Sequence, residues 1–109
     1  MKEIQNNSPV LQEPLSSIEE YILILLSAAS PEALYGLDIL NRLNGVCAQF
    51  GRNALGAGSL YPAFHRMEEA GLVEGSWGDV SGGARRKYYQ ISEKGEMSLK
   101  ITRQFRASL

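Results

Sequence analysis

The first strongly apolar stretch of the chain covers residues 18–29, where apolar side chains surround most of a helix after its first turn. Ser16 or Ser17, each followed three residues later by a glutamate, forms the capping-box pattern that starts a helix. Pro31 cannot continue that helix. Because a helix that is apolar on all sides must be covered on all sides, this segment predicts a central helix with more than one packing partner.

Two further helices follow. The second is predicted from about residue 34 to 46 and is stopped by Gly45, and its apolar stripe is formed by Leu37, Leu40 and Leu43. After a glycine-containing loop, Ser59 is predicted to cap a third helix, with Pro62 in its first turn and Gly71 just past its end. The core-facing side of this third helix is formed by Leu60, Phe64 and Met67.

Beyond Gly71 the pattern changes from helix to strand. Residues 72–77 and 86–91 are strand candidates on either side of the glycine-containing segment 78–85, which predicts a β-hairpin with a long tip. Ser92 then caps a last helix, on which an apolar residue recurs at every fourth position: Met97, Ile101, Phe105 and Leu109. The order helix, helix, helix, strand, strand, helix predicts a mainly α fold with a small β-hairpin, an α+β arrangement.

At 109 residues the chain can bury only a modest core, which favours an oligomer. Its net charge of −1 hides an asymmetry, because residues 1–41 carry one cation and six anions whereas residues 42–109 carry ten cations and six anions. The basic part can face phosphate. Cys47 is the single cysteine and is expected to be a small buried or half-buried apolar residue. Without a leader segment or a long apolar span, the sequence predicts a cytoplasmic protein that does not insert into a membrane.

The side of the third helix opposite its core stripe carries hydrogen-bond donors. Tyr61 and His65 lie on this side and Arg66 borders it. Such groups can contact phosphates or base edges in a major groove of DNA. A solvated helix face accounts for the same residues equally well.

A basic cluster follows the glycines of the hairpin tip. In the sequence SGGARRKYY, the cations Arg85, Arg86 and Lys87 come shortly after Gly82 and Gly83. Glycines let a loop approach another surface closely, and an uncompensated basic cluster beside such a loop suits the phosphate backbone or a minor groove. Ordinary solvated charge is the competing interpretation.

Little in the sequence supports catalysis. Cys47 and His65 are too few to hold a metal without distant carboxylates, and Ser59 lies six residues from His65 on one helix, too far for a nucleophile and its base. We therefore predict no enzyme, no cofactor and no metal. Trp77 is interpreted as an aromatic anchor of the sheet, with stacking on a planar ligand as the alternative.

Three segments, LYGLDILNRL, GSLYPAFHRMEEAGLVEG and GGARRKYYQISEKGE, closely resemble the PadR-like family of bacterial winged-helix transcriptional regulators. The resemblance covers residues 21–99 and implies a winged helix-turn-helix fold, in which the third helix enters the major groove and the hairpin is the wing. The predicted DNA-contacting residues are Ser59, Tyr61, Pro62, His65 and Arg66 on the helix, and Gly83, Arg85, Arg86 and Lys87 on the wing. The family often has a lysine or arginine where His65 stands, so base preference is expected to differ.

The resemblance also implies the short form of the family, with one dimerising helix after the wing. We predict an N-terminal arm over residues 1–15, a winged-helix DNA-binding domain over residues 16–91 and a C-terminal dimerisation helix over residues 92–109. The first and last helices are expected to cover each other in a homodimer through Tyr21, Leu25, Met97, Ile101, Phe105 and Leu109.

The predicted function is that of a homodimeric repressor that binds an inverted-repeat operator in double-stranded DNA. In size and in its short last helix, the chain is similar to a family member that lengthens the circadian period in cyanobacteria, which adds clock control as an expectation. Two alternatives stay open. One is a winged-helix module that binds an acidic protein, and the other is a repressor that responds to a planar aromatic effector at the dimer interface.

Overall fold

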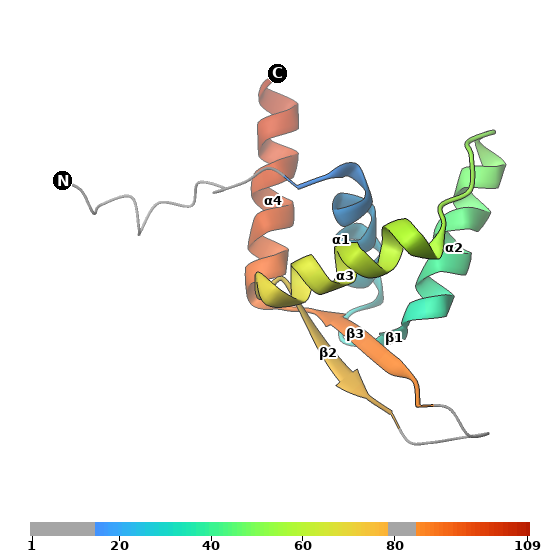
Figure 1. Cartoon of the computed structure of the whole chain (residues 1–109). Helices are drawn as coiled ribbons and strands as arrows, with labels where there is room; N and C mark the ends of the chain where they lie inside the picture. Colours follow the sequence, from blue (N-terminus) through green and yellow to red (C-terminus); the bar gives the residue numbers. More distant parts are fainter. Residues whose placement is uncertain (1–14, 79–84) are drawn as a thin grey trace.

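Figure 1 shows the computed structural model of the chain, which describes residues 15–78 and 85–109. The elements, in order, are α1 (Ser17–Ala29), β1 (Leu34–Tyr35), α2 (Gly36–Gln49), α3 (Ala57–Glu69), β2 (Val73–Trp77), β3 (Lys87–Ile91) and α4 (Glu93–Ser108). This order confirms the predicted α+β fold and adds one strand. The predicted arm, except Leu15, and the predicted wing residue Gly83 lie outside the described residues. No helix within the described ranges is long and apolar enough to cross a bilayer.

The additional strand is β1, which lies on the opposite side of β3 from β2 in an antiparallel sheet. Tyr89 of β3 is paired with Leu34 on one side and with Gly75 on the other. The prediction that a helix begins near Leu34 is therefore wrong, because α2 begins at Gly36. A strand of two residues has no period that the sequence could reveal, and it forms here because β3 offers its second edge.

α2 is longer than predicted and contains Gly45 in its interior, so the prediction that Gly45 stops it is wrong. The position is exposed, with no atom within 4 Å of the place where a Cβ would lie. A single glycine costs a helix only about 1 kcal/mol relative to alanine. The helix ends instead before Gly51, whose φ of 66° lies in the left-handed region that glycine favours.

α3 begins earlier than predicted, with Gly56 as its N-cap residue and no capping side chain. The predicted cap at Ser59 is therefore wrong, since Ser59 lies inside the first turn. Pro62 is inside the helix rather than in its first turn, and its ring nitrogen cannot donate to the carbonyl of Gly58. Glycine is a weak helix former, so the two glycines around Ala57 hide the true start of the helix. The predicted stop at Gly71 is confirmed by its φ of 77°.

The core lies between α1, α3 and the sheet, as the apolar pattern predicts. Phe64 of α3 stacks on Tyr89 of β3, with ring centroids 4.1 Å apart and ring planes 13° apart. Burial also raises the pKa of the Tyr89 hydroxyl above its ordinary value. The most deeply buried large side chains are Phe64, Ile22, Leu23, Leu26, Ile39, Leu60, Met67 and Leu99.

α4 packs one side against its own subunit and leaves another exposed. Ser92 caps it as predicted, by accepting a 3.0 Å hydrogen bond from the Gly95 amide. Leu99 is buried in the common core, and Arg106 donates to the carboxylate of Glu20 on α1 over 2.6 Å. This hydrogen bond raises the pKa of the Arg106 guanidinium above its ordinary value. The exposed large apolar residues of α4 are Met97, Phe105 and Leu109.

At Gly95, α4 packs directly against Leu72 and Ile91. We therefore expect Gly95→Ala to be strongly destabilising. A Cβ there would overlap the Leu72 carbonyl oxygen and lie 2.7 Å from Ile91 Cγ1. Overpacking of this kind costs about 1 to 3 kcal/mol in free energy of unfolding. Gly45→Ala is the matched control and should gain up to about 1 kcal/mol, because it adds a helix-forming side chain in open space. Urea unfolding of both variants tests the contrast, and equal stabilities would contradict it.

Candidate nucleic-acid interface

The predicted recognition residues of α3 lie on its exposed side. Ser59, Tyr61, Pro62 and His65 are all exposed, whereas the opposite side of the helix is buried in the core. The ring of Tyr61 is held edge-on against Phe64, with centroids 5.8 Å apart, while 44% of the residue stays accessible. α3 therefore presents a tyrosine whose ring packs on the core and an exposed imidazole to a partner.

Gly36 lies where the start of α2 meets the aromatic rings of α3. It is the buried first residue of α2, and a Cβ there would lie 3.4 Å from the Tyr61 ring and 3.5 Å from the Phe64 ring. The first turn of α2 therefore packs directly beside the two aromatic rings of α3. The motif LYGLD carries this residue, but periodicity does not reveal its packing role.

Arg66 and His65 both have carboxylate neighbours. Arg66 donates from Nε to Oε2 of Glu19 on α1 over 3.1 Å, so this predicted DNA contact already has a partner within the chain. His65 Nε2 lies 3.4 Å from Oε2 of Glu69, one turn along α3, and both side chains are well exposed. Both predicted DNA contacts therefore already face a carboxylate of the same chain.

Two arginines that directly precede β3 lie on aromatic rings. The guanidinium carbon of Arg85 is 5.0 Å from the centroid of Trp77, and that of Arg86 is 5.0 Å from the centroid of Tyr35. Planar guanidinium groups stack on aromatic faces while their N–H donors stay available. Trp77 is 56% exposed at the end of β2, where its ring carries the Arg85 guanidinium.

Lys87 differs from its two arginine neighbours because its charge is compensated. Its Nζ donates to Oε1 of Glu68 on α3 over 2.9 Å. This hydrogen bond raises the pKa of Lys87 above its ordinary value. The prediction of three uncompensated cations is therefore wrong for Lys87, because its partner lies nineteen residues away in the sequence and becomes a neighbour only in the fold.

The recognition side of α3 and the basic hairpin belong to one continuous segment of the fold. α3 leads through the turn at Gly71 into β2, and Figure 1 shows the β2–β3 hairpin projecting away from the helices beside α3. One continuous segment therefore carries both a helix that can enter a DNA groove and a basic hairpin.

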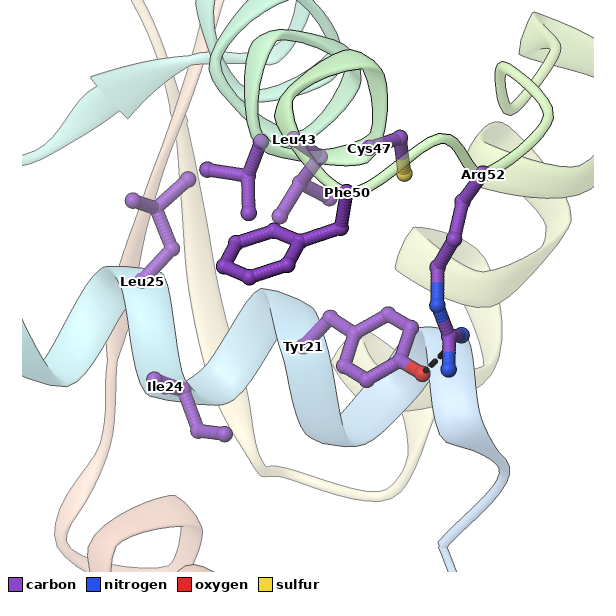
Figure 2. A pocket seen from close by; sticks show the side chains of 8 residues that line it. Tyr21, Ile24, Leu25, Leu43, Cys47, Phe50 and Arg52 are labelled. Carbon is purple, nitrogen blue, oxygen red and sulfur yellow. Dashed lines mark hydrogen bonds between the residues drawn. The ribbon is translucent and has the colours of Figure 1, made fainter.

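A separate apolar groove lies between α1 and α2. It has a volume of about 370 Å³ and is lined by Tyr21, Ile24, Leu25, Leu43, Val46, Cys47, Phe50 and Arg52. Figure 2 shows the Phe50 ring over the groove and the Arg52 guanidinium at one end, where it donates to the Tyr21 hydroxyl over 3.4 Å. Phe50 is 75% exposed. Cys47 is half-buried and free, which confirms its predicted role as a small packing residue.

The chain belongs to the PadR-like family of transcriptional regulators, since a model of that family matches residues 24–101. This membership confirms both the family resemblance and the prediction that the protein is not an enzyme. An uncharacterized protein of Lysinibacillus sphaericus is 44% identical over 41 residues, which are 38% of this chain and 38% of that relative.

Solved structures of PadR-like proteins share the fold. A PadR-like transcription factor from bacteroid fragilis is 28% identical with a TM-score of 0.68, and the match covers 84% of this chain and 81% of that one. A PadR-like transcriptional regulator from Bacillus cereus is 34% identical with a TM-score of 0.62 and coverages of 80% and 78%. Bacillus subtilis PadR in complex with operator DNA has a TM-score of 0.68 at 20% identity, with coverages of 82% and 47%.

Proposed function

We propose that the protein binds double-stranded DNA sequence-specifically and represses transcription as a homodimer. One observation carries this proposal: the exposed side of α3 bears hydrogen-bond donors, and two arginines that directly precede β3 lie on aromatic rings. α3 would read base edges in the major groove, and Arg85 and Arg86 would meet the phosphate backbone. That a structural neighbour, Bacillus subtilis PadR, was solved with operator DNA supports this assignment.

The homodimer rests on two uncovered apolar surfaces of the same chain. One is the α1–α2 groove, and the other is the exposed side of α4, where Phe105 is 61% and Leu109 88% exposed. Seating α4 of one subunit in the groove of its partner would cover both surfaces in a single two-fold interface. The two-fold axis makes this contact twice, and Met97 and Ile101 of each α4 would take part in it.

A two-fold axis makes a prediction about the DNA target. It would present two copies of α3 about one turn of DNA, roughly 34 Å, apart. We therefore propose an inverted-repeat operator with half-sites about 10 base pairs apart or a multiple of that. The additional resemblance to Pex, the circadian period-extending protein of this family, rests on size and on the short last helix, so clock control stays a prediction.

The exposed side of α3 is tested by substituting Tyr61 and His65. Tyr61→Phe should weaken binding of the preferred duplex by about 1 to 2 kcal/mol, because it removes one hydrogen bond to a charged acceptor. His65→Ala should mainly change which sequences are preferred. Fluorescence anisotropy with a panel of duplexes measures both, and unchanged affinity and preference in both variants would show that this side does not read DNA.

Salt dependence separates DNA binding from the alternative of a module that contacts an acidic protein. Each phosphate contact contributes a slope of about −0.9 to a plot of log affinity against log salt concentration. A duplex-binding dimer with several such contacts should therefore lose affinity steeply between low and physiological salt. Binding that is weak at all salt concentrations, with tight capture of an acidic protein instead, would favour the alternative.

A further inference from the structure

An ion pair joins the recognition helix α3 to β3, the second strand of the wing. Glu68 lies near the end of α3 and Lys87 begins β3, and their 2.9 Å hydrogen bond passes over β2. Their side chains are 33% and 28% exposed, so the pair is partly shielded from solvent. We name this contact the Glu68–Lys87 bridge.

Gly75 of β2 makes room for this bridge. A Cβ at Gly75 would lie 2.6 Å from Lys87 Cε and 2.7 Å from Glu68 Oε2, well inside van der Waals contact. The Lys87 ammonium also lies 5.4 Å from the Trp77 ring centroid and 5.6 Å from that of Tyr89. The absence of a side chain at Gly75 thus lets three elements, α3, β2 and β3, meet at one ion pair.

We propose that Glu68 and Lys87 are positioning residues, which hold the wing at a fixed place relative to the recognition helix instead of contacting DNA themselves. This inference rests on the proposed DNA-binding function. A phosphate contact by Lys87 would have to compete with the Glu68 carboxylate, which accepts one of the three N–H donors of Lys87 and offsets its charge. Arg85 and Arg86, stacked on rings next to it, are the residues whose position the bridge would fix.

Whether Glu68→Gln raises or lowers DNA affinity distinguishes a Lys87 that positions the wing from a Lys87 that contacts phosphate. If Lys87 contacts phosphate, removing its carboxylate partner should strengthen DNA binding. If the bridge positions the wing, Glu68→Gln should weaken binding about two- to fivefold, the worth of a partly shielded ion pair. Glu69→Gln is the matched control, because it removes the same charge from the next residue of α3, where the side chain is 70% exposed.

Gly75→Ala breaks the bridge without changing any charge. The added methyl group must displace Lys87 or Glu68, both of which have flexible ends. We expect a similar two- to fivefold loss of affinity, with little further loss when Lys87→Met is added. Lys87→Met alone should leave the salt slope unchanged, whereas loss of one phosphate contact per subunit would reduce its magnitude by about 1 for each subunit, and so by about 2 for the dimer.

Amide hydrogen exchange of the protein without DNA provides an independent readout. Exchange in β2 and β3 should be faster in Glu68→Gln than in Glu69→Gln, because the hairpin loses its tie to α3. Tighter duplex binding by Glu68→Gln than by Glu69→Gln, or a reduced salt slope in Lys87→Met, would overturn the positioning proposal. A wild-type protein that binds no duplex would instead overturn the proposed function, while the exchange comparison would still test the bridge.

Discussion

Replacing Arg85 and Arg86 together with glutamate is expected to abolish detectable binding of duplex DNA at physiological salt. Both side chains are exposed and lie on the rings of Trp77 and Tyr35, outside the core. In a dimer the substitution replaces four cations with four anions at the phosphate backbone. Losing four phosphate contacts alone costs several orders of magnitude in affinity, and like-charge repulsion adds to that loss. Electrophoretic mobility shift with a labelled duplex measures the effect.

The matched control for this charge reversal is Lys100→Glu with Arg103→Glu. Both residues are exposed on α4, away from the hairpin, and their reversal changes net charge by the same amount. The control should reduce affinity only modestly, through long-range electrostatics. Circular dichroism and thermal unfolding should show native folds for both variants. Equal affinity of the Arg85 and Arg86 variant and the wild type would contradict the assignment of the wing.

The second large effect concerns the dimer. Phe105→Asp with Leu109→Asp should convert the protein to a monomer and reduce operator binding by about 100-fold or more, because one subunit buries too little surface to hold a site. Both residues are exposed within the subunit, so the fold should persist. Phe50→Asp, in the proposed receiving groove, should give the same monomer. Sedimentation velocity at micromolar concentration measures the mass of each variant.

The choice of these substitutions follows from the packing of α4. A chain cut after Ser92 would lose Leu99 from the common core and the Glu20–Arg106 contact, so it would unfold for reasons unrelated to dimerisation. Changes on the exposed side avoid this problem. A wild-type protein that sediments as a monomer and still binds its operator with one protein per site would contradict the dimer.

Much of the fold is predictable because its elements carry strong local signals. The predicted capping box is present at Ser16, whose backbone amide donates to the Glu19 carboxylate over 2.9 Å. The cap at Ser92 and the stop at Gly71 are equally local. What the sequence does not reveal depends on neighbours that are distant in the chain. β1 exists only because β3 has a free edge, and nothing within residues 34–35 signals a strand.

The candidate site also has features that the local sequence predicts and features that depend on residues distant in the chain. Exposure of the predicted side of α3 follows from the positions of its apolar residues, which a helical period fixes. The ion pairs do not follow from the helical period, because their partners are distant in the sequence. Arg66 contacts Glu19 across 47 positions and Lys87 contacts Glu68 across 19. Basic residues that look equivalent in the sequence therefore differ in the fold according to whether a carboxylate lies nearby.

The central claim, sequence-specific DNA binding by a dimer, is tested most directly by selection from a pool of random-sequence duplexes. The intact protein is incubated with the pool at about physiological salt, and retained duplexes are amplified and sequenced over several rounds. The proposed function predicts enrichment of an inverted repeat with half-sites about 10 base pairs, or a multiple of that, apart. A retained pool as diverse as the starting pool would contradict it.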